Sequence, residues 1–301
     1  MPPPTPIAVL LNPDAGAASG RPQIAAELAE LFRALGREAE IVELPHRQDP
    51  LEAARSASTR STIVVAAGGD GTVRGVAAGL AGAPAALGIL PLGTLNHFAR
   101  DLRIPLDLQK AVAVVAAGHT ARIDAGLVNG SVFVNNSSIG IYPSIVDTRE
   151  ALRSQGHRKW PAMAIATFRV LRRYRGVKVT IEIDGRRHTW RTPFVFVGNN
   201  EYTIDGVGLG SRARLDEGML FVYLAPRVRA RDLPLLLAKA LAGRARQSGE
   251  FEIVRAGELW IDKSRTGRPQ YVALDGEVRI MNAPLHYQAR PGALRVVVPQ
   301  S

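Results

Sequence analysis

The chain has 301 residues, a formal net charge of +11 at neutral pH and no cysteine. The lack of cysteine excludes disulfides, thiolate metal sites and cysteine nucleophiles. Hydrophobic residues make up 46% of the chain and charged residues 22%. That balance is typical of globular rather than disordered proteins. Length alone favours two domains, at roughly 150 residues each.

The distribution of apolar and basic residues bears on location. No apolar run approaches the roughly 18 residues of a membrane-spanning helix, and the first residues lack the basic segment of a signal peptide. We therefore expect a cytoplasmic protein. The positive charge favours polyanionic partners, namely nucleic acid, anionic lipid surfaces or phosphorylated small molecules. A soluble enzyme from a host with arginine-rich proteins would have the same charge.

The first 120 residues alternate strand and helix signals, which predicts a parallel sheet covered on both faces. Ligands of such sheets bind at the carboxyl ends of the strands, where two glycine-rich turns fall. Strands are predicted over residues 7–11, 41–42, 62–67 and 86–90, and helices over residues 22–35, 51–58, 73–80 and 95–102.

From about residue 123 the pattern changes to short strands, which predicts a mostly antiparallel sandwich or barrel. Asp184-Gly185 is typical of a hairpin turn, and two inserted helices are predicted near residues 160–174 and 232–241. The strands are expected over residues 132–134, 177–183, 194–197, 220–224 and 251–254. The fold class is thus α/β plus β-rich, with domains at residues 1–122 and 123–301, and the last strand is a candidate to return to the first domain.

Residues 68–72, GGDGT, carry the sharpest signal. Three glycines let the backbone approach a ligand, and the helix that follows offers free N–H groups to a phosphate. Asp70 would repel a phosphate unless a divalent cation lay between them. The alternative is a plain strand-to-helix turn in which Asp70 caps the helix.

Residues 91–100, PLGTLNHFAR, repeat this arrangement one strand later. Gly93 permits close approach, and Thr94 and Asn96 can donate hydrogen bonds to phosphate oxygens or a ribose. Two further turns complete the set: residues 12–16, NPDAG, at the end of the first strand, and residues 274–277, LDGE, near the C-terminus. The last could equally be an ordinary hairpin turn.

The order and spacing of these four motifs resemble those of the diacylglycerol kinase catalytic-domain family of lipid kinases. The likeness to its bacterial soluble members extends over nearly the whole chain. GGDGT alone is shared with NAD kinases, whereas the PLGT motif favours the lipid branch. The resemblance implies an α/β nucleotide domain, a β-rich lipid domain and an active site between them. It also implies ATP-dependent, Mg²⁺-dependent phosphorylation of a lipid hydroxyl.

The resemblance also assigns roles by position. Glu277 falls where the family places its general base. Asp70 and Asp124 fall in a carboxylate–water–Mg²⁺ network, to which Asp275 is expected to belong. The residues implied in nucleotide binding are Asn12, Gly68, Gly69, Asp70, Gly71, Thr72 and Thr94.

Two positions depart from the family pattern. His97 stands where members commonly carry Asp, so either the network tolerates the loss or metal handling differs; His97 could also merely cap the helix surface. Glu217 stands where Asp is usual in a turn that holds a structural Mg²⁺. The implied ligands there are Glu217 and the main-chain carbonyls of Arg214 and Met219. A solvent-exposed acidic turn is the alternative.

Basic residues gather around both predicted inserted helices. Residues 149–178 contain nine Lys and Arg against one Glu, with apolar residues such as Trp160 and Phe168 between them, and residues 227–246 are similar. Such a segment could bind an anionic bilayer, at roughly 1 kcal/mol per cation near the surface. Solvated surface helices would look the same. No recognised nucleic-acid motif accompanies the charge, so nucleic-acid binding is not expected.

The sequence therefore predicts an ATP- and Mg²⁺-dependent lipid kinase, peripheral at the inner membrane surface, with a diacylglycerol-like acceptor. Two alternatives stay open: a NAD kinase-like phosphotransferase with a soluble acceptor, and a catalytically impaired lipid or nucleotide sensor, for which His97 is the support. Phosphatidylglycerol and a sphingoid-type alcohol stay open as other acceptors, because the sequence does not identify the exact lipid, and it does not give the oligomeric state.

Overall fold

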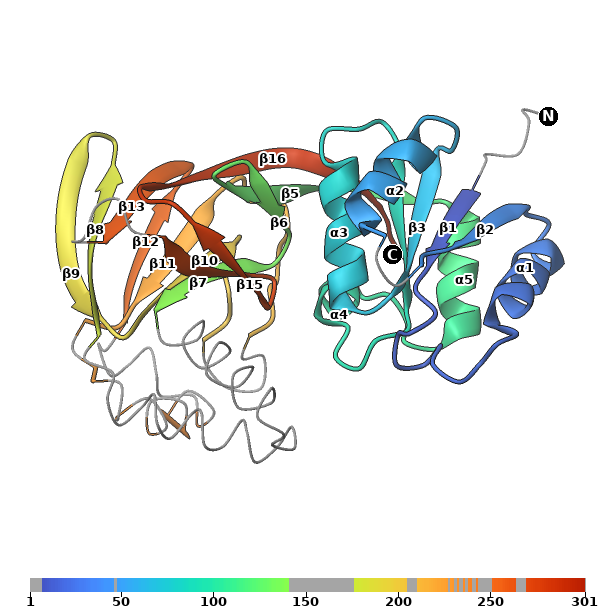
Figure 1. Ribbon diagram of the computed structural model, residues 1–301, viewed down its shortest axis with the longest axis horizontal. Helices are drawn as coiled ribbons and strands as arrows, with labels where there is room; N and C mark the ends of the chain where they lie inside the picture. The colour runs from blue at the N-terminus through green and yellow to red at the C-terminus, as the bar shows by residue number, and fades with distance from the viewer. Residues whose placement is uncertain are drawn as a thin grey trace. The chain divides into compact units, whose positions relative to one another are not determined.

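The computed structural model describes residues 7–45, 48–140, 176–204, 210–226, 251–263 and 269–300, with isolated residues between 228 and 242. Two compact units can be recognised, and each is described by itself (Figure 1). The first unit comprises residues 1–125 and 291–301, and the second comprises residues 126–290.

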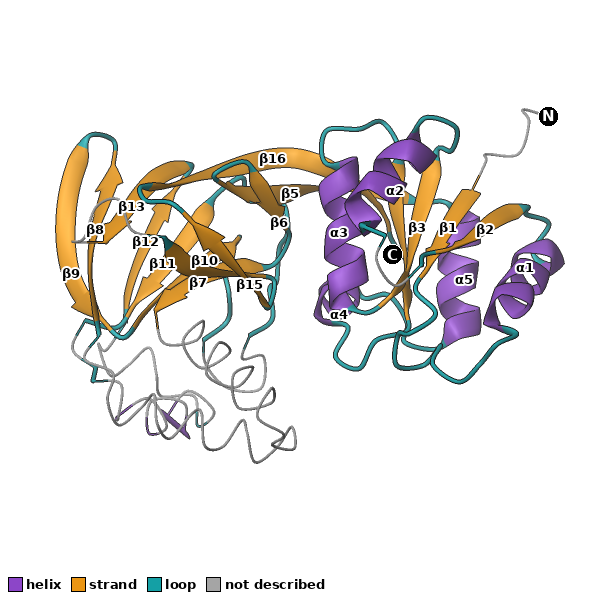
Figure 2. Ribbon diagram, viewed as in Figure 1, coloured by secondary structure: helices purple, strands orange, loops and turns teal. Residues whose placement is uncertain are grey.

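The first unit is a parallel sheet between helices (Figure 2). Its strands lie in the order β2-β1-β3-β4, and the end of β16 pairs in parallel with β4. α1 contacts α5 and α2 contacts α3, as right-handed crossovers on two faces require. Its elements are β1 (Ile7–Leu11), α1 (Ile24–Ala34), β2 (Ala39–Glu43), α2 (Pro50–Ser58), β3 (Ile63–Gly68), α3 (Asp70–Leu80), β4 (Ala86–Pro91), α4 (His97–Asp101), α5 (Leu108–Ala117), part of β5 (Thr120–Val128) and part of β16 (Leu285–Val297).

Two glycines set how closely α2 and α3 pack. Gly75 and Gly79 are four residues apart, so they lie on one face of α3. A Cβ at Gly79 would lie 2.4 Å from the carbonyl oxygen of Leu51, and one at Gly75 would lie 2.8 Å from Pro50. α3 therefore packs directly on α2, which fixes the helix that begins at Asp70.

The second unit consists of antiparallel strands in two sheets. One sheet has the order β12-β11-β10-β7-β14-β15, and the other contains β16-β13-β8-β9 with the β5–β6 hairpin attached. The elements are β6 (Ser131–Phe133), β7 (Asn136–Gly140), β8 (Val177–Ile183), β9 (Arg186–Thr192), β10 (Phe194–Asn199), β11 (Leu220–Leu224), β12 (Glu252–Ala256), β13 (Glu258–Lys263), β14 (Gln270–Leu274) and β15 (Glu277–Met281), together with the remaining residues of β5 and β16.

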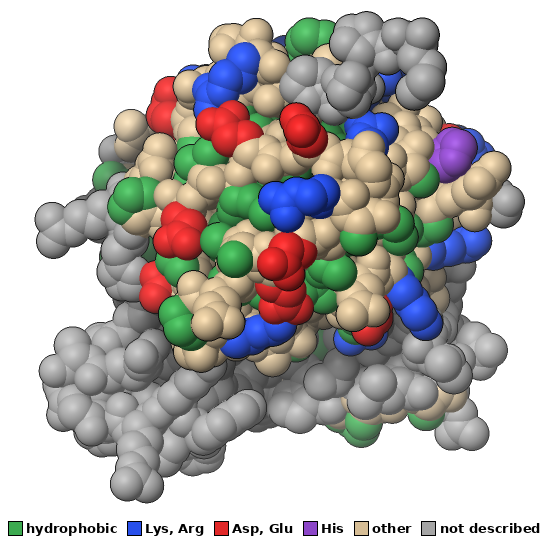
Figure 3. Space-filling model, turned by 90° about the vertical axis from the view of Figure 1, so that its right-hand side faces the viewer, with side chains coloured by type: hydrophobic (Ala, Val, Ile, Leu, Met, Phe, Trp, Pro, Cys, Tyr) green, Lys and Arg blue, Asp and Glu red, His purple; other side chains and the backbone are tan. Residues whose placement is uncertain are grey.

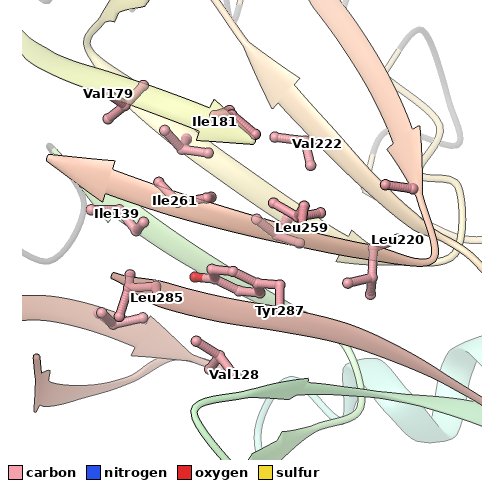
Figure 4. Close-up of a cluster of buried hydrophobic side chains, with 14 of the residues drawn as sticks. Val128, Ile139, Val179, Ile181, Leu220, Val222, Leu259, Ile261, Leu285 and Tyr287 are labelled. Carbon is pink, nitrogen blue, oxygen red and sulfur yellow. The ribbon is translucent and has the colours of Figure 1, made fainter. Parts of the chain in front are cut away.

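The core of the second unit is an apolar cluster to which both sheets contribute, including Ile139 and Val222 from one and Ile181 and Ile261 from the other (Figure 4). Tyr287 is fully buried in this cluster, and its hydroxyl lies 2.9 Å from the Ser137 hydroxyl. Burial raises the pKa of Tyr287 well above its ordinary value, while the Ser137 hydrogen bond acts in the opposite direction. Tyr287 is therefore a neutral core residue.

The structure confirms the predicted fold class, a parallel α/β sheet followed by antiparallel β-structure. The expected hairpin is present as well: Asp184 and Gly185, both with positive φ, join β8 and β9. The helices predicted near residues 160–174 and 232–241 lie almost entirely outside the described residues. Among the residues that the structure describes, no helix is long and apolar enough to span a membrane.

Candidate active site

The GGDGT motif forms the turn between β3, which ends at Gly68, and α3, which begins at Asp70. Gly68 leaves no room for a side chain, since a Cβ there would lie 2.5 Å from the Thr72 hydroxyl oxygen. Gly69 precedes the helix and provides no side-chain cap. The first N–H groups of α3 therefore lack helical acceptors and form the positive end of the helix dipole, an arrangement that suits a phosphate.

Three turns come into contact at the carboxyl ends of β1, β3 and β4. Strand register places Leu11 beside Ala67 and Gly68 beside Pro91. The Asn12 side-chain amide donates to the Thr72 hydroxyl at 3.1 Å, and its main-chain N–H donates to the carbonyl of Ala67 at 2.9 Å. The predicted NPDAG, GGDGT and PLGT motifs thus share one edge of the first unit.

Gly93 and Gly69 touch through their backbones. A Cβ at Gly93 would lie 2.5 Å from the Cα of Gly69 and 2.8 Å from the Asn96 side-chain oxygen. We expect Gly93→Ala to separate the two turns and to destabilise the first unit by about 1–3 kcal/mol, the usual cost of overpacking. Urea unfolding measures this as a lower denaturation midpoint, and titration with ATP should show weaker binding.

Gly257→Ala is the matched control for this prediction, because a Cβ at Gly257 would meet no atom within 4 Å. It should unfold like the wild type. If Gly93→Ala unfolds at the same urea concentration as Gly257→Ala and binds ATP equally well, the close packing of the two turns does not shape the site.

Asp70 is the acidic residue at this edge. It lies in the first turn of α3 and is partly exposed. Its carboxylate makes no hydrogen bond or ion pair with any residue that the structure describes. The helix dipole stabilises a negative charge there, so the carboxylate is available to a cation rather than used within the fold.

The polar side chains of the PLGT turn differ in burial: Asn96 is buried, whereas Thr94 and His97 are exposed. Asn96 is buried with φ +51; its side-chain oxygen accepts from the Gly93 N–H at 3.0 Å, and its amide donates to the Gly93 carbonyl at 2.7 Å. These contacts favour a role for Asn96 in closing the turn, and its predicted nucleotide contact stays a prediction. Thr94 and His97 are exposed, and His97 is the first residue of α4.

Asp124 lies on β5 and is 2% exposed. One of its oxygens accepts the Gly292 N–H at 2.9 Å, and Arg122, two residues earlier on the same strand, donates to the Gly292 carbonyl at 3.2 Å. Gly292 has φ +58, a conformation that favours glycine. Asp124 therefore helps to fix this bend in β16. Its membership of a Mg²⁺ network remains a prediction.

The LDGE motif forms the hairpin turn of the second unit between β14 and β15. Asp275 and Gly276 have φ values of +45 and +88. The Asp275 carboxylate accepts the main-chain N–H groups of Val134, Asn135 and Asn136 at 2.8–2.9 Å. Glu277 is the first residue of β15, and its side chain is exposed. The contacts of Asp275 favour an anchoring role for it, while Glu277 is accessible to a substrate.

The residues of the implied structural cation site also make contacts within the protein. Glu217 Oε2 accepts the Glu201 N–H at 2.8 Å, and the Met219 carbonyl accepts the Asn200 N–H at 3.1 Å. The Arg214 guanidinium pairs with Asp216 at 3.1 Å, and this hydrogen bond raises the pKa of Arg214. The described residues hold no cluster of three acidic, His or Cys side chains. Glu217 thus joins two chain segments, and the cation site formed with the carbonyls of Arg214 and Met219 stays a prediction.

A polar cluster in the second unit, not predicted from the sequence, is centred on Arg212, which is 5% exposed. Its guanidinium donates to the carbonyls of Val134 and Asn199 at 2.7 and 3.0 Å and to the Asn135 side chain at 2.7 Å. The available signal was the pair of Asn-Asn sequences at residues 135–136 and 199–200, because adjacent asparagines at strand ends commonly bond to backbone.

Comparison with known proteins gives two domain matches. Residues 6–128 match the diacylglycerol kinase catalytic domain, and residues 144–298 match the YegS C-terminal NAD kinase beta sandwich-like domain. A crystal structure of a candidate diacylglycerol kinase from Bacillus anthracis str. Sterne superposes with a TM-score of 0.79 at 22% identity, covering 98% of this chain and 95% of that one. The chain therefore shares the fold of that structure over nearly its whole length.

Proteins related to this chain in sequence belong to the same class as the domain matches. A "Probable lipid kinase YegS-like" from Pseudomonas fluorescens is 33% identical over 244 residues, 79% of this chain and 78% of that protein. A diacylglycerol kinase from Staphylococcus saprophyticus is 31% identical over 196 residues, 64% of this chain and 63% of that protein, so the match spans just under two thirds of its length. The chain belongs to the diacylglycerol kinase catalytic-domain family of YegS-like lipid kinases.

Proposed function

We propose that this protein transfers the γ-phosphoryl group of ATP to a lipid hydroxyl, with a diacylglycerol-like acceptor that becomes phosphatidic acid. The observation that carries the proposal is the edge of the first unit, where three touching turns lie at the N-terminus of α3 beside the Asp70 carboxylate, which bonds to no residue that the structure describes. Membership of a lipid kinase family supports the choice of acceptor.

The nucleotide is assigned to the three turns. The N–H groups at the start of α3 and the exposed Thr94 hydroxyl donate to phosphate oxygens, and the Asn12–Thr72 hydrogen bond holds two of the turns together. Mg²⁺ binds through one or two carboxylates, phosphate oxygens and water, which fits a single available Asp70. When bound, the ion neutralises charge on the phosphates. Asp124 is proposed as a further member of this network.

Glu277 is proposed as the general base. The lipid hydroxyl oxygen forms a bond to the γ-phosphorus, the bond from that phosphorus to the β-phosphate oxygen breaks and ADP leaves. The hydroxyl proton passes to the Glu277 carboxylate, which is exposed at the start of β15. The Glu277 carboxylate follows a tight turn on a paired strand, so its backbone is held in one conformation.

The charge distribution supports action at an anionic membrane surface. Residues 126–290 contain 26 Lys and Arg against 15 Asp and Glu, whereas the first unit contains 12 of each. The whole excess of positive charge thus belongs to the second unit. The face drawn in Figure 3 carries acidic and basic side chains interspersed, with no large field of either sign. The basic segments at residues 149–175 lie outside the described residues.

The test is transfer of labelled phosphate from ATP to diacylglycerol, phosphatidylglycerol, a sphingoid alcohol and NAD. We expect transfer to a lipid, in the presence of Mg²⁺, and none to NAD. Diacylglycerol presented in phosphatidylglycerol vesicles should react faster than in neutral phosphatidylcholine vesicles. That advantage should shrink when salt is raised from 0.05 to 0.5 M, because salt screens surface charge over about 10 Å at 0.1 M.

Other results would contradict the proposal in distinct ways. Transfer to NAD alone would establish a soluble acceptor. ATP binding without transfer to any acceptor would indicate a sensor rather than an enzyme. Equal rates in anionic and neutral vesicles at every salt concentration would remove the membrane-surface part of the proposal and leave the kinase part standing.

A further inference from the structure

A three-residue segment of the second unit, residues 134–136, runs from the end of β6 to the first residue of β7 and is held from two sides by ionisable side chains. The Asp275 carboxylate accepts all three of its main-chain N–H groups. The buried Arg212 guanidinium donates to the Val134 carbonyl and to the Asn135 side chain. The segment is therefore fixed through both its donors and its acceptors.

Burial makes the Arg212 contacts necessary. A guanidinium that is 5% exposed loses most of its hydration, and only hydrogen bonds of good geometry offset that loss. The hydrogen bonds of Arg212 include three at 2.7–3.0 Å, and its guanidinium carbon lies 5.3 Å from the centre of the Tyr202 ring. A planar fork with five donors suits two carbonyls and an amide oxygen, which a lysine ammonium cannot match in geometry.

The segment in turn determines the position of the LDGE turn. The Asp275 N–H donates back to the Asn136 carbonyl at 2.9 Å. Asp275 and Gly276 both have positive φ, as the tight hairpin turns that join antiparallel strands require. Asp275 is therefore at once a turn residue and the anchor of the turn, and Glu277 follows it by two residues.

We propose that Arg212 is a positioning residue for Glu277. It acts through residues 134–136 and the Asp275 carboxylate, without contact with substrate. In this way it keeps the Glu277 carboxylate in the orientation needed to accept the proton of the lipid hydroxyl. This inference rests on the proposed function, in which Glu277 is the general base. It also explains why Asp275 gives its oxygens to main-chain N–H groups.

The test uses the full chain with Arg212→Lys, Glu277→Gln and the double variant. Arg212→Lys keeps the charge and loses the fork, so we expect kcat to fall about 10- to 100-fold, the cost of a misplaced reacting group. The KM for ATP should stay within twofold, since the nucleotide turns belong to the first unit. Because Arg212 acts through Glu277, the double variant should be no slower than Glu277→Gln alone.

The control is Arg255→Lys, an exposed arginine on β12, which should leave kcat unchanged. Independent losses that multiply in the double variant would overturn the proposal, as would an unchanged kcat for Arg212→Lys. Hydrogen exchange gives a readout without catalysis: the amides of residues 134–136 and 274–277 should exchange at least tenfold faster in Arg212→Lys. If the wild type phosphorylates no acceptor, the proposed function fails. If Arg212→Lys leaves hydrogen exchange at residues 274–277 unchanged, Arg212 does not position the LDGE turn, whatever the protein phosphorylates.

Discussion

Replacing Asp70 with asparagine is expected to lower kcat by at least about 100-fold, the usual cost of removing one preorganised electrostatic group from an active site. Asparagine has nearly the same shape but no charge, so the turn between β3 and α3 should keep its form. The neutral amide oxygen holds a cation against phosphate oxygens more weakly than a carboxylate does. Steady-state transfer assays at several Mg²⁺ concentrations should therefore show a lower kcat and a higher apparent Mg²⁺ requirement.

This variant is informative because Asp70 has no side-chain partner in the described part of the chain. Since the Asp70 carboxylate bonds to no described residue, its removal should cost the fold little. Asp70→Asn should unfold at the wild-type temperature within a few degrees. Asp184→Asn is the matched control, because Asp184 has φ +50 in a hairpin turn where asparagine is equally accepted. Wild-type turnover in Asp70→Asn, with an unchanged Mg²⁺ requirement, would refute the assignment.

The first hundred residues could be predicted well because each strand there is a short apolar run followed by turn chemistry. All six residues of β3 and of β4 are buried, and so are all five of β1. The prediction nevertheless missed α5, although Asp107 caps it by accepting the Lys110 N–H at 3.0 Å. Asp107 follows Pro105 by two residues, and a proline just after a helix is typical of a chain that leaves the helix rather than of one that begins another.

The second unit was harder to predict, because several of its strands lack an apolar pattern. β7 has the sequence NSSIG, and the five-residue strand β15 contains two charged residues, Glu277 and Arg279. β16 contains Pro291-Gly292 in its middle, which reads as a turn. In the structure the Gly292 bend is held by Asp124 and Arg122 on β5. Contacts between residues about 170 positions apart cannot be derived from one sequence.

The candidate site, like the fold, could be predicted only in part. The glycine turns could be located because glycine has few other reasons to recur at strand ends. The roles of the polar side chains could not be predicted. Asn96 closes its own turn and Asp275 binds three main-chain N–H groups. An asparagine or aspartate in a turn has the same sequence signature whether it bonds to backbone or to a ligand.

Glu277→Gln is the second variant with a large expected effect. Proton acceptance by a positioned group contributes about 10²- to 10⁴-fold in rate, so kcat should fall within that range. Glutamine fits the exposed start of β15 without disturbing the Asp275 anchor. The KM for ATP and the unfolding temperature should therefore stay at wild-type values. Glu252→Gln is the control: Glu252 is exposed and accepts from the Trp190 indole at 2.5 Å, a bond that glutamine can keep.

Chemical rescue separates a base from a structural carboxylate. Glu277→Ala leaves space at the start of β15, and added formate can enter it and accept the hydroxyl proton. We expect formate to raise the rate of Glu277→Ala in a saturable manner and to leave Glu277→Gln unchanged, since its side chain still fills the space. If formate has no effect on Glu277→Ala while both variants bind ATP less tightly, Glu277 serves nucleotide binding and the proton has another acceptor. Because β15 itself remains paired with β14 in either variant, such a result would concern the chemistry of residue 277 and not the integrity of the sheet.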